Sequence, residues 1–260
     1  MRCIVDAAKI KCWLLDMDGT VYLGGRPIDG AVEAIGRMRS QAKVLFLTNN
    51  TSVARSDYAD KLNFMHIRAT EDDIYTAGNA TIDWLKKHGI TDKIFLLGTD
   101  KLKAEFIRAG LGLTDTVPDM VVVGFDTALR YERLSLCCKH IREGVRFIAT
   151  HPDFNCPVGD GYIPDVGSFL ALIKASTGRD PELVCGKPNP PIAEGVAARA
   201  GCRPDEIAMV GDRLMTDMRF AVNNGFKSVL VLSGEATAED AAASGLPLDA
   251  IVPSIAHILV

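Results

Sequence analysis

The sequence lacks the features that mark secreted, membrane-bound and nucleic-acid-binding proteins. Its seven cysteines include no CxxC pair, and Cys137 and Cys138 are adjacent, so they fit neither a zinc site nor a disulfide framework. No apolar run approaches the roughly 18 residues of a membrane-spanning helix. The N-terminal segment MRCIVDAAKIKCW has too short an apolar patch for a secretory signal. A net charge of −4 argues against a large basic surface. We therefore expect a reduced, cytoplasmic protein with no membrane or nucleic-acid partner.

Short apolar runs recur along the chain, and 48% of its residues are hydrophobic, enough for a substantial core. The runs are CWLL (12–15), VLFL (44–47), IFLL (94–97), MVVV (120–123), RFIA (146–149), ELVC (182–185), IAMV (207–210) and SVLVL (228–232). Helical patterns such as 31–41 and 190–201 separate them. This alternation predicts an α/β fold with parallel strands. Because the runs are apolar throughout, we expect both faces of each strand to be covered.

The loops that follow the strands divide the chain. The runs at 44–47 and 182–185 lead into TNN and GKP, whereas the three runs between them lead into GTD, GFD and THPD. The difference indicates an insertion. We predict a doubly wound, Rossmann-like parallel-sheet core formed by residues 1–78 and 184–260, with an inserted α/β cap domain at 79–183.

Carboxylates follow two of the predicted core strands. Asp16 and Asp18 come directly after the first strand, and Asp212 and Asp217 follow the run at 207–210. In open α/β sheets, ligands bind beyond the carboxyl ends of the strands, where these side chains would meet. Four converging carboxylates would repel one another unless a cation lies between them. Hard oxygen ligands without histidine or cysteine favour Mg²⁺.

Polar groups follow the other core strands as well. Thr48, Asn49 and Asn50 end the second strand, and Lys187 precedes Pro188, which keeps it out of a helix. A lysine, a hydroxyl and loop N–H groups, together with a magnesium ion, form a receptor for a phosphoryl group. Each motif alone also has a plain structural interpretation, as an Asx turn, a solvated loop charge or a helix cap. Their order and placement at strand ends favour a phosphoryl-transfer site.

At these residues the sequence resembles the haloacid dehalogenase superfamily, and specifically its aspartate-nucleophile phosphatases. The matching motifs are DMDGT (16–20), the strand that ends in Thr48, Lys187 in GKP, and GDRLMTD (211–217). The large insertion resembles the nitrophenylphosphatase-like (NagD-type) branch, which has a type-II α/β cap. The resemblance covers essentially the whole chain. In that family GTVYLGGRPI (19–28) would form a flap hairpin, with Gly24 and Gly25 in its turn.

The resemblance implies a role for each catalytic residue. Asp16 would attack phosphorus and form an aspartyl-phosphate, and Asp18 would serve as general acid and then general base. Phosphoryl oxygens would be bound by Thr48, Lys187 and the backbone amides near Asn49 and Asn50. Mg²⁺ would be held by Asp16, the carbonyl of Asp18, Asp212 and, directly or through water, Asp217.

The expected activity is Mg²⁺-dependent hydrolysis of small phosphate monoesters. Alternatives left open are a phosphomutase of the same superfamily and a non-catalytic or receiver-like phospho-aspartate signalling protein. The sequence also leaves open a homo-oligomer.

The segment 151–173 contains no lysine or arginine, and its side chains predict the kind of leaving group. Its acidic and its apolar or aromatic residues are Asp153, Asp160, Asp165, Phe154, Tyr162 and Ile163. We expect them to disfavour an anionic leaving group and to admit nucleoside, sugar, polyol or aryl groups.

Overall fold

The computed structural model describes residues 5–158 and 161–258, which form two compact units. Among these residues, the core unit comprises 5–48, 55–75 and 193–258, and the insert unit comprises 49–54, 76–158 and 161–192. The segment 49–54, which follows Thr48, thus belongs to the insert unit. That residues 79–183 act as a functional cap remains a prediction.

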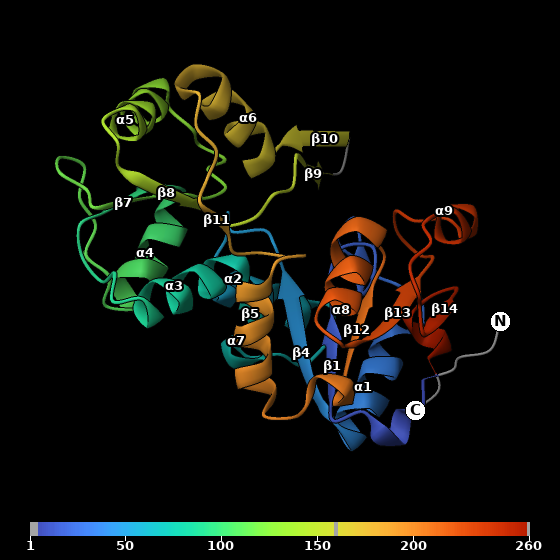
Figure 1. The fold of residues 1–260 in the computed structure, drawn as a ribbon. Helices are drawn as coiled ribbons and strands as arrows, with labels where there is room; N and C mark the ends of the chain where they lie inside the picture. The colour runs from blue at the N-terminus through green and yellow to red at the C-terminus, as the bar shows by residue number, and fades with distance from the viewer. Residues whose placement is uncertain (1–4, 159–160, 259–260) are drawn as a thin grey trace. The chain divides into compact units, whose positions relative to one another are not determined.

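The core unit contains a six-stranded sheet of order β14-β13-β12-β1-β4-β5 (Figure 1). Its strands are β1 (Cys12–Leu15), β4 (Lys43–Thr48), β5 (Ile74–Thr76), β12 (Ile207–Gly211), β13 (Lys227–Val231) and β14 (Ala250–Val252). β1 is parallel to both of its neighbours, and Leu14 lies opposite Met209 on one side and Leu45 on the other. The strand order runs outward from β1 in both directions, so the predicted doubly wound parallel core is confirmed.

Helices and a hairpin complete the core unit. The helices are α1 (Ala31–Gln41), α2 (Arg55–Phe64), α7 (Pro190–Ala200, whose first three residues lie in the insert unit), α8 (Arg219–Asn223) and α9 (Ala238–Ala243). α1 has the predicted bounds, and its buried residues Ala31, Ala34, Ile35 and Met38 form one stripe at helical spacing. The expected hairpin is present as β2 (Tyr22–Leu23) and β3 (Arg26–Pro27), and Gly24 and Gly25 adopt positive φ in its turn.

The insert unit has its own parallel sheet, of order β11-β8-β7-β6. The strands are β6 (Ile94–Leu97), β7 (Met120–Val123), β8 (Arg146–Ala149) and β11 (Leu183–Val184). The helices are α3 (Ala77–Lys87), α4 (Asp100–Arg108), α5 (Tyr131–Arg142) and α6 (Val166–Thr177). A small antiparallel hairpin, β9 (Asn155–Val158) and β10 (Gly161–Pro164), precedes α6.

Both faces of this second sheet are covered, which explains why its strands are apolar throughout. Phe95, Val121 and Phe147 point to one face and share a core cluster with Cys137 and Ile173 from α5 and α6. The alternate strand residues are also buried, and α3 and α4 lie on the other side of the sheet (Figure 1). No helix in the described part of the chain is long and apolar enough to cross a membrane.

Candidate active site

Three aspartates of the core unit gather at the carboxyl end of its sheet. Asp16 follows β1, and its backbone N–H continues the strand pairing by donating to Val210 O at 2.9 Å. Asp212 follows β12, and Asp217 lies in the helical turn Leu214–Met218. One carboxylate oxygen from each aspartate lies within 4.8 Å of the others. The structure thus brings together three of the four predicted metal ligands through their side chains.

Asp212 is buried and tightly enclosed by backbone. Its carboxylate accepts hydrogen bonds from the Glu235 N–H at 2.8 Å and, more weakly, from the Thr20 hydroxyl at 3.4 Å. A Cβ on Gly19 would lie 2.3 Å from Asp212 Oδ2, and one on Gly234 would lie 2.0 Å from it. Two loops therefore approach this carboxylate so closely that both positions require glycine.

Asp217 is held from within its own motif. It is fully buried, and its Oδ2 accepts the Arg213 N–H at 3.1 Å. Burial, and next the charge of Asp217, raise the pKa of Asp212 above its usual value. A divalent cation would relieve this repulsion. With Asp16, the two buried carboxylates provide hard oxygen donors, a set that fits Mg²⁺.

Asp18 occupies a more open position beside this cluster, and its side chain remains exposed. Partial desolvation raises its pKa, while Lys61, Tyr22 and Arg213 act in the opposite direction. The Lys61 ammonium lies 3.7 Å from the centroid of the buried Tyr22 ring. Lys61 and Tyr22 were not among the predicted site residues. Lys61 lies in α2, the helix that follows the TNN motif, and nothing in its sequence neighbourhood distinguishes it from a solvated lysine.

Thr48 ends β4 in the core unit, and Asn49 follows it directly in the insert unit. The Asn49 side chain contacts the backbone of Lys187, whose N–H donates to Asn49 Oδ1 at 2.8 Å. Asn49 Nδ2 donates in turn to the Lys187 carbonyl at 3.0 Å. Asn50 closes an Asx turn by accepting from the Ser52 N–H and hydroxyl at 2.8 and 2.7 Å. Both asparagine side chains therefore have structural partners, which leaves backbone amides for the predicted phosphate contacts.

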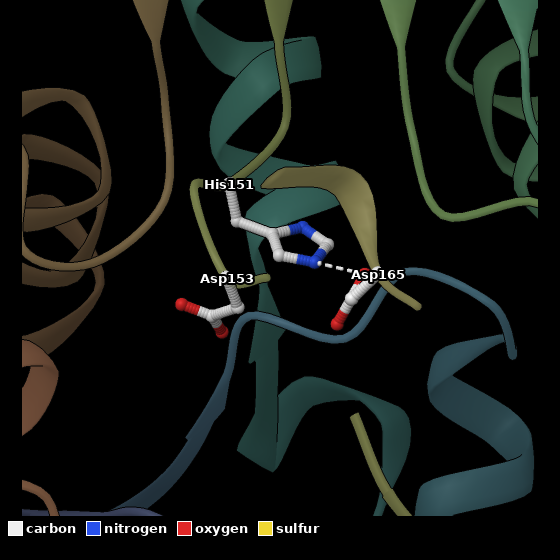
Figure 2. Close-up of side chains that lie close together, drawn as sticks. All are labelled: His151, Asp153 and Asp165. Carbon is white, nitrogen blue, oxygen red and sulfur yellow. Dashed lines mark hydrogen bonds and ion pairs between the residues drawn. The ribbon is translucent and has the colours of Figure 1, made fainter. Parts of the chain in front are cut away.

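His151, Asp153 and Asp165 lie close together in the insert unit (Figure 2). His151 Nε2 is hydrogen-bonded to Asp165 Oδ1 at 2.9 Å, and its Nδ1 to the Thr150 hydroxyl at 2.9 Å. Asp165 Oδ1 also caps α6 by accepting the Val166 N–H at 2.7 Å. The pair ties the end of β8 to the start of α6.

The spacing of these three side chains is compatible with a cation, but their bonds favour a hydrogen-bond network. Both ring nitrogens of His151 already have partners. Asp153 accepts the Asn49 amide at 3.1 and 3.3 Å, and its carboxylate points away from the imidazole in Figure 2. We therefore assign no metal to this cluster.

These bonds show the partners of two of the three acids in the segment 151–173. Asp165 is buried and paired with His151, and Asp153 is bonded to Asn49. Asp160 lies outside the described residues. The sequence pattern could not distinguish a paired carboxylate from an exposed one. The expected aromatic surface is present, since Phe154 and Tyr162 are 60% and 68% exposed.

Comparison with protein families gives two matches. A family model described as haloacid dehalogenase-like hydrolase matches residues 13–112. A second model, HAD-hydrolase-like, matches residues 184–258. The two matches cover the segments that contain all of the predicted catalytic and metal-binding residues.

Individual proteins are similar over nearly the whole chain. An acid sugar phosphatase of Staphylococcus epidermidis is 34% identical over 239 residues, which are 91% of this chain and 92% of that protein. The crystal structure of 4-nitrophenylphosphatase from Thermotoga maritima is 41% identical with a TM-score of 0.93, covering 96% of each chain. The glycerol phosphate phosphatase of Mycobacterium tuberculosis, crystallised with calcium, is 30% identical with a TM-score of 0.89, covering 98% of this chain and 76% of that one.

Proposed function

The chain belongs to the haloacid dehalogenase-like hydrolase family, and from this premise we propose that it is a Mg²⁺-dependent phosphatase of small phosphate monoesters. Its relatives of the nitrophenylphosphatase-like branch, predicted from the motifs, are named as phosphatases. The observation that carries the proposal is the convergence of Asp16, Asp212 and Asp217 within 4.8 Å at the end of a parallel sheet.

In the proposed reaction the two aspartates of the first motif have different tasks. Asp16 attacks phosphorus and forms an aspartyl-phosphate while the bond to the leaving-group oxygen breaks. Asp18 donates a proton to that oxygen, and then removes a proton from the water that hydrolyses the aspartyl-phosphate. Partial desolvation raises the pKa of Asp18, which is the direction that a general acid needs.

The remaining residues bind the negative charge of the phosphoryl group, including the charge that develops on it during the reaction. Asp16, the carbonyl of Asp18, Asp212 and Asp217 would hold Mg²⁺, which would neutralise phosphoryl oxygens when bound. Thr48, the amides near Asn49 and Asn50, and Lys187 would donate to those oxygens. The calcium bound by the Mycobacterium relative supports a divalent cation in this family.

For the leaving group we propose sugar, polyol and aryl alcohols, with nucleosides as a further class. The names of the three relatives contain a sugar phosphate, a glycerol phosphate and a nitrophenyl phosphate. The exposed rings of Phe154 and Tyr162 offer apolar surface to an aromatic or sugar group. The acids of the segment 151–173 would still disfavour an anionic leaving group, because the hydrogen bond from the neutral Asn49 amide does not remove the charge of the Asp153 carboxylate.

A phosphomutase is the alternative that shares the most chemistry, since it also forms an aspartyl-phosphate. A receiver domain receives no support from the comparisons, whose matches are to hydrolases and phosphatases. The products separate the two enzymes, because a phosphatase releases inorganic phosphate and a mutase returns an isomeric ester.

The test is phosphate release from a panel of monoesters with Mg²⁺ and with EDTA. We expect activity only with the metal, and none in Asp16→Asn, which keeps the shape of the side chain and removes the nucleophile. A folded Asp16→Asn variant with wild-type turnover would contradict covalent catalysis at this residue. Isomerised ester without released phosphate would support the mutase.

A further inference from the structure

We propose that the side chain of Asn49 positions Lys187 and that Asp153 fixes the orientation of the Asn49 amide. The inference rests on the proposed function, in which Lys187 binds the phosphoryl group. The family motif assigns Asn49 to the phosphate through its backbone. The hydrogen bonds of its side chain point to a separate task.

The Asn49 amide bridges both backbone polar groups of Lys187. Its Oδ1 accepts the lysine N–H at 2.8 Å, and its Nδ2 donates to the lysine carbonyl at 3.0 Å. Because these groups flank the Cα of Lys187, the two bonds fix the direction in which the lysine side chain leaves the backbone. Asn49 is 5% exposed and Lys187 is 2% exposed, so water cannot easily replace a lost bond.

Asp153 determines which end of the amide faces the lysine N–H. Asn49 Nδ2 donates to its carboxylate oxygens at 3.1 and 3.3 Å. An ionised carboxylate only accepts hydrogen bonds, so it favours Nδ2 and leaves Oδ1 for the N–H of Lys187. Without this acceptor the amide can rotate by half a turn, and its NH₂ would then meet the lysine N–H.

Neighbouring backbone holds the arrangement in place. A Cβ on Gly186 would lie 2.6 Å from Asn49 Oδ1 and 2.8 Å from His151 Cβ, so the loop before Lys187 packs directly against both side chains. The Gly186 N–H donates to Thr150 O at 2.6 Å. Since His151 is bonded to Asp165, the segment that presents Asp153 is fixed at its start.

Three variants test the proposal with 4-nitrophenyl phosphate as substrate. Asn49→Asp removes the donor and places a second carboxylate beside Asp153, so we expect kcat to fall by about 100-fold, the scale of a 1 Å misplacement of a catalytic group. Asp153→Asn should lower kcat by roughly 10-fold, because the amide orientation is no longer fixed. The double variant restores a donor–acceptor pair with its direction reversed. It should recover about 10-fold of the loss seen in Asn49→Asp.

Asn63 provides a matched control. Its amide makes the same double bridge to one backbone residue, accepting the Ala69 N–H at 3.2 Å and donating to Ala69 O at 2.8 Å. Asn63→Asp therefore removes the same chemistry near the end of α2, where no predicted site residue lies. The melting temperature should fall for this variant, because the bridge to Ala69 is lost. Its kcat should stay within about twofold of wild type, since most substitutions outside the site have small effects.

The outcomes distinguish the inference from the function on which it rests. If Lys187→Met is inactive while Asn49→Asp keeps wild-type kcat, the positioning role is overturned and the lysine role stands. If Lys187→Met is fully active, the role proposed for Lys187 is itself wrong. Equal losses of kcat in Asn49→Asp and Asn63→Asp would also overturn the inference. A folded double variant that recovers nothing would refute the part assigned to Asp153.

Discussion

Replacing Asp212 by asparagine should stabilise the metal-free protein while abolishing its response to Mg²⁺. Asparagine has nearly the same shape, can still accept the Glu235 N–H, and can donate to Thr20 where the aspartate accepts. The substitution therefore keeps the local bonds. It removes a charge that lies within 4.8 Å of Asp16 and Asp217.

The size of the effect follows from these separations. Two unit charges 4.8 Å apart repel by about 3.5 kcal/mol at an effective dielectric constant of about 20. The positive charge of Arg213 and the raised pKa of Asp212 offset part of this repulsion. We expect a net gain of about 1–3 kcal/mol in the free energy of unfolding. Each kcal/mol should raise the melting temperature by about 2–4 °C.

Thermal unfolding in EDTA and in excess Mg²⁺ is the assay. Wild type should gain about 2.7 kcal/mol when Mg²⁺ is 100-fold above its dissociation constant, whereas Asp212→Asn should gain almost nothing. Asp249→Asn, which removes a carboxylate elsewhere in the core unit, should keep the Mg²⁺ response. The reasoning is refuted if Asp212→Asn melts below wild type in EDTA, or if it retains the full shift with Mg²⁺.

Three other substitutions test the site and the core by rate, pH dependence and metal affinity. Asp18→Asn should lower kcat for alkyl phosphates by about 10²–10⁴-fold and much less for 4-nitrophenyl phosphate, whose leaving group needs no proton; equal losses would contradict a general acid. Burial alone would raise the pKa of Asp249, but hydrogen bonds from Ser228 and a neighbouring lysine lower it below its ordinary value. The ionised carboxylate therefore stabilises the fold at pH values above that ordinary pKa. Asp249→Asn should therefore lower the free energy of unfolding at pH 7. Measured by chemical denaturation, this difference from wild type should disappear as the pH falls through the folded-state pKa of Asp249. A difference that does not depend on pH would argue against this. Gly234→Ala places a methyl group against Asp212 Oδ2 and should weaken Mg²⁺ binding in calorimetry, whereas unchanged affinity would show that the loop yields easily.

The sequence was informative where one physical signal dominates. Every predicted strand is present, because uniformly apolar runs between helical patterns have few other structures open to them. The short strands β5 and β14 were not predicted, since three residues carry too little periodicity to detect. They form edges of the core sheet, where pairing with a longer neighbour determines the conformation.

Residue types predicted the acidic cluster, but the partners of individual side chains depended on tertiary structure. Asp153 and Asp165 have the same chemistry in the sequence as an exposed carboxylate, and only the fold pairs them with Asn49 and His151. The same limit applies to Lys61, whose contact with the Tyr22 ring joins a helix to the flap hairpin.

The interleaving of the two units has a consequence for the order of events during synthesis. β1 lies between β4 and β12 in the core sheet, so one of its two partners is made almost 200 residues after it. The four strands of the parallel sheet in the insert unit, by contrast, all lie between residues 94 and 184 and can pair before β12 leaves the ribosome. Asp16 emerges early, but its companions Asp212 and Asp217 emerge late. The nascent chain can therefore pair the strands of the insert sheet before all the residues of the predicted metal site have been made.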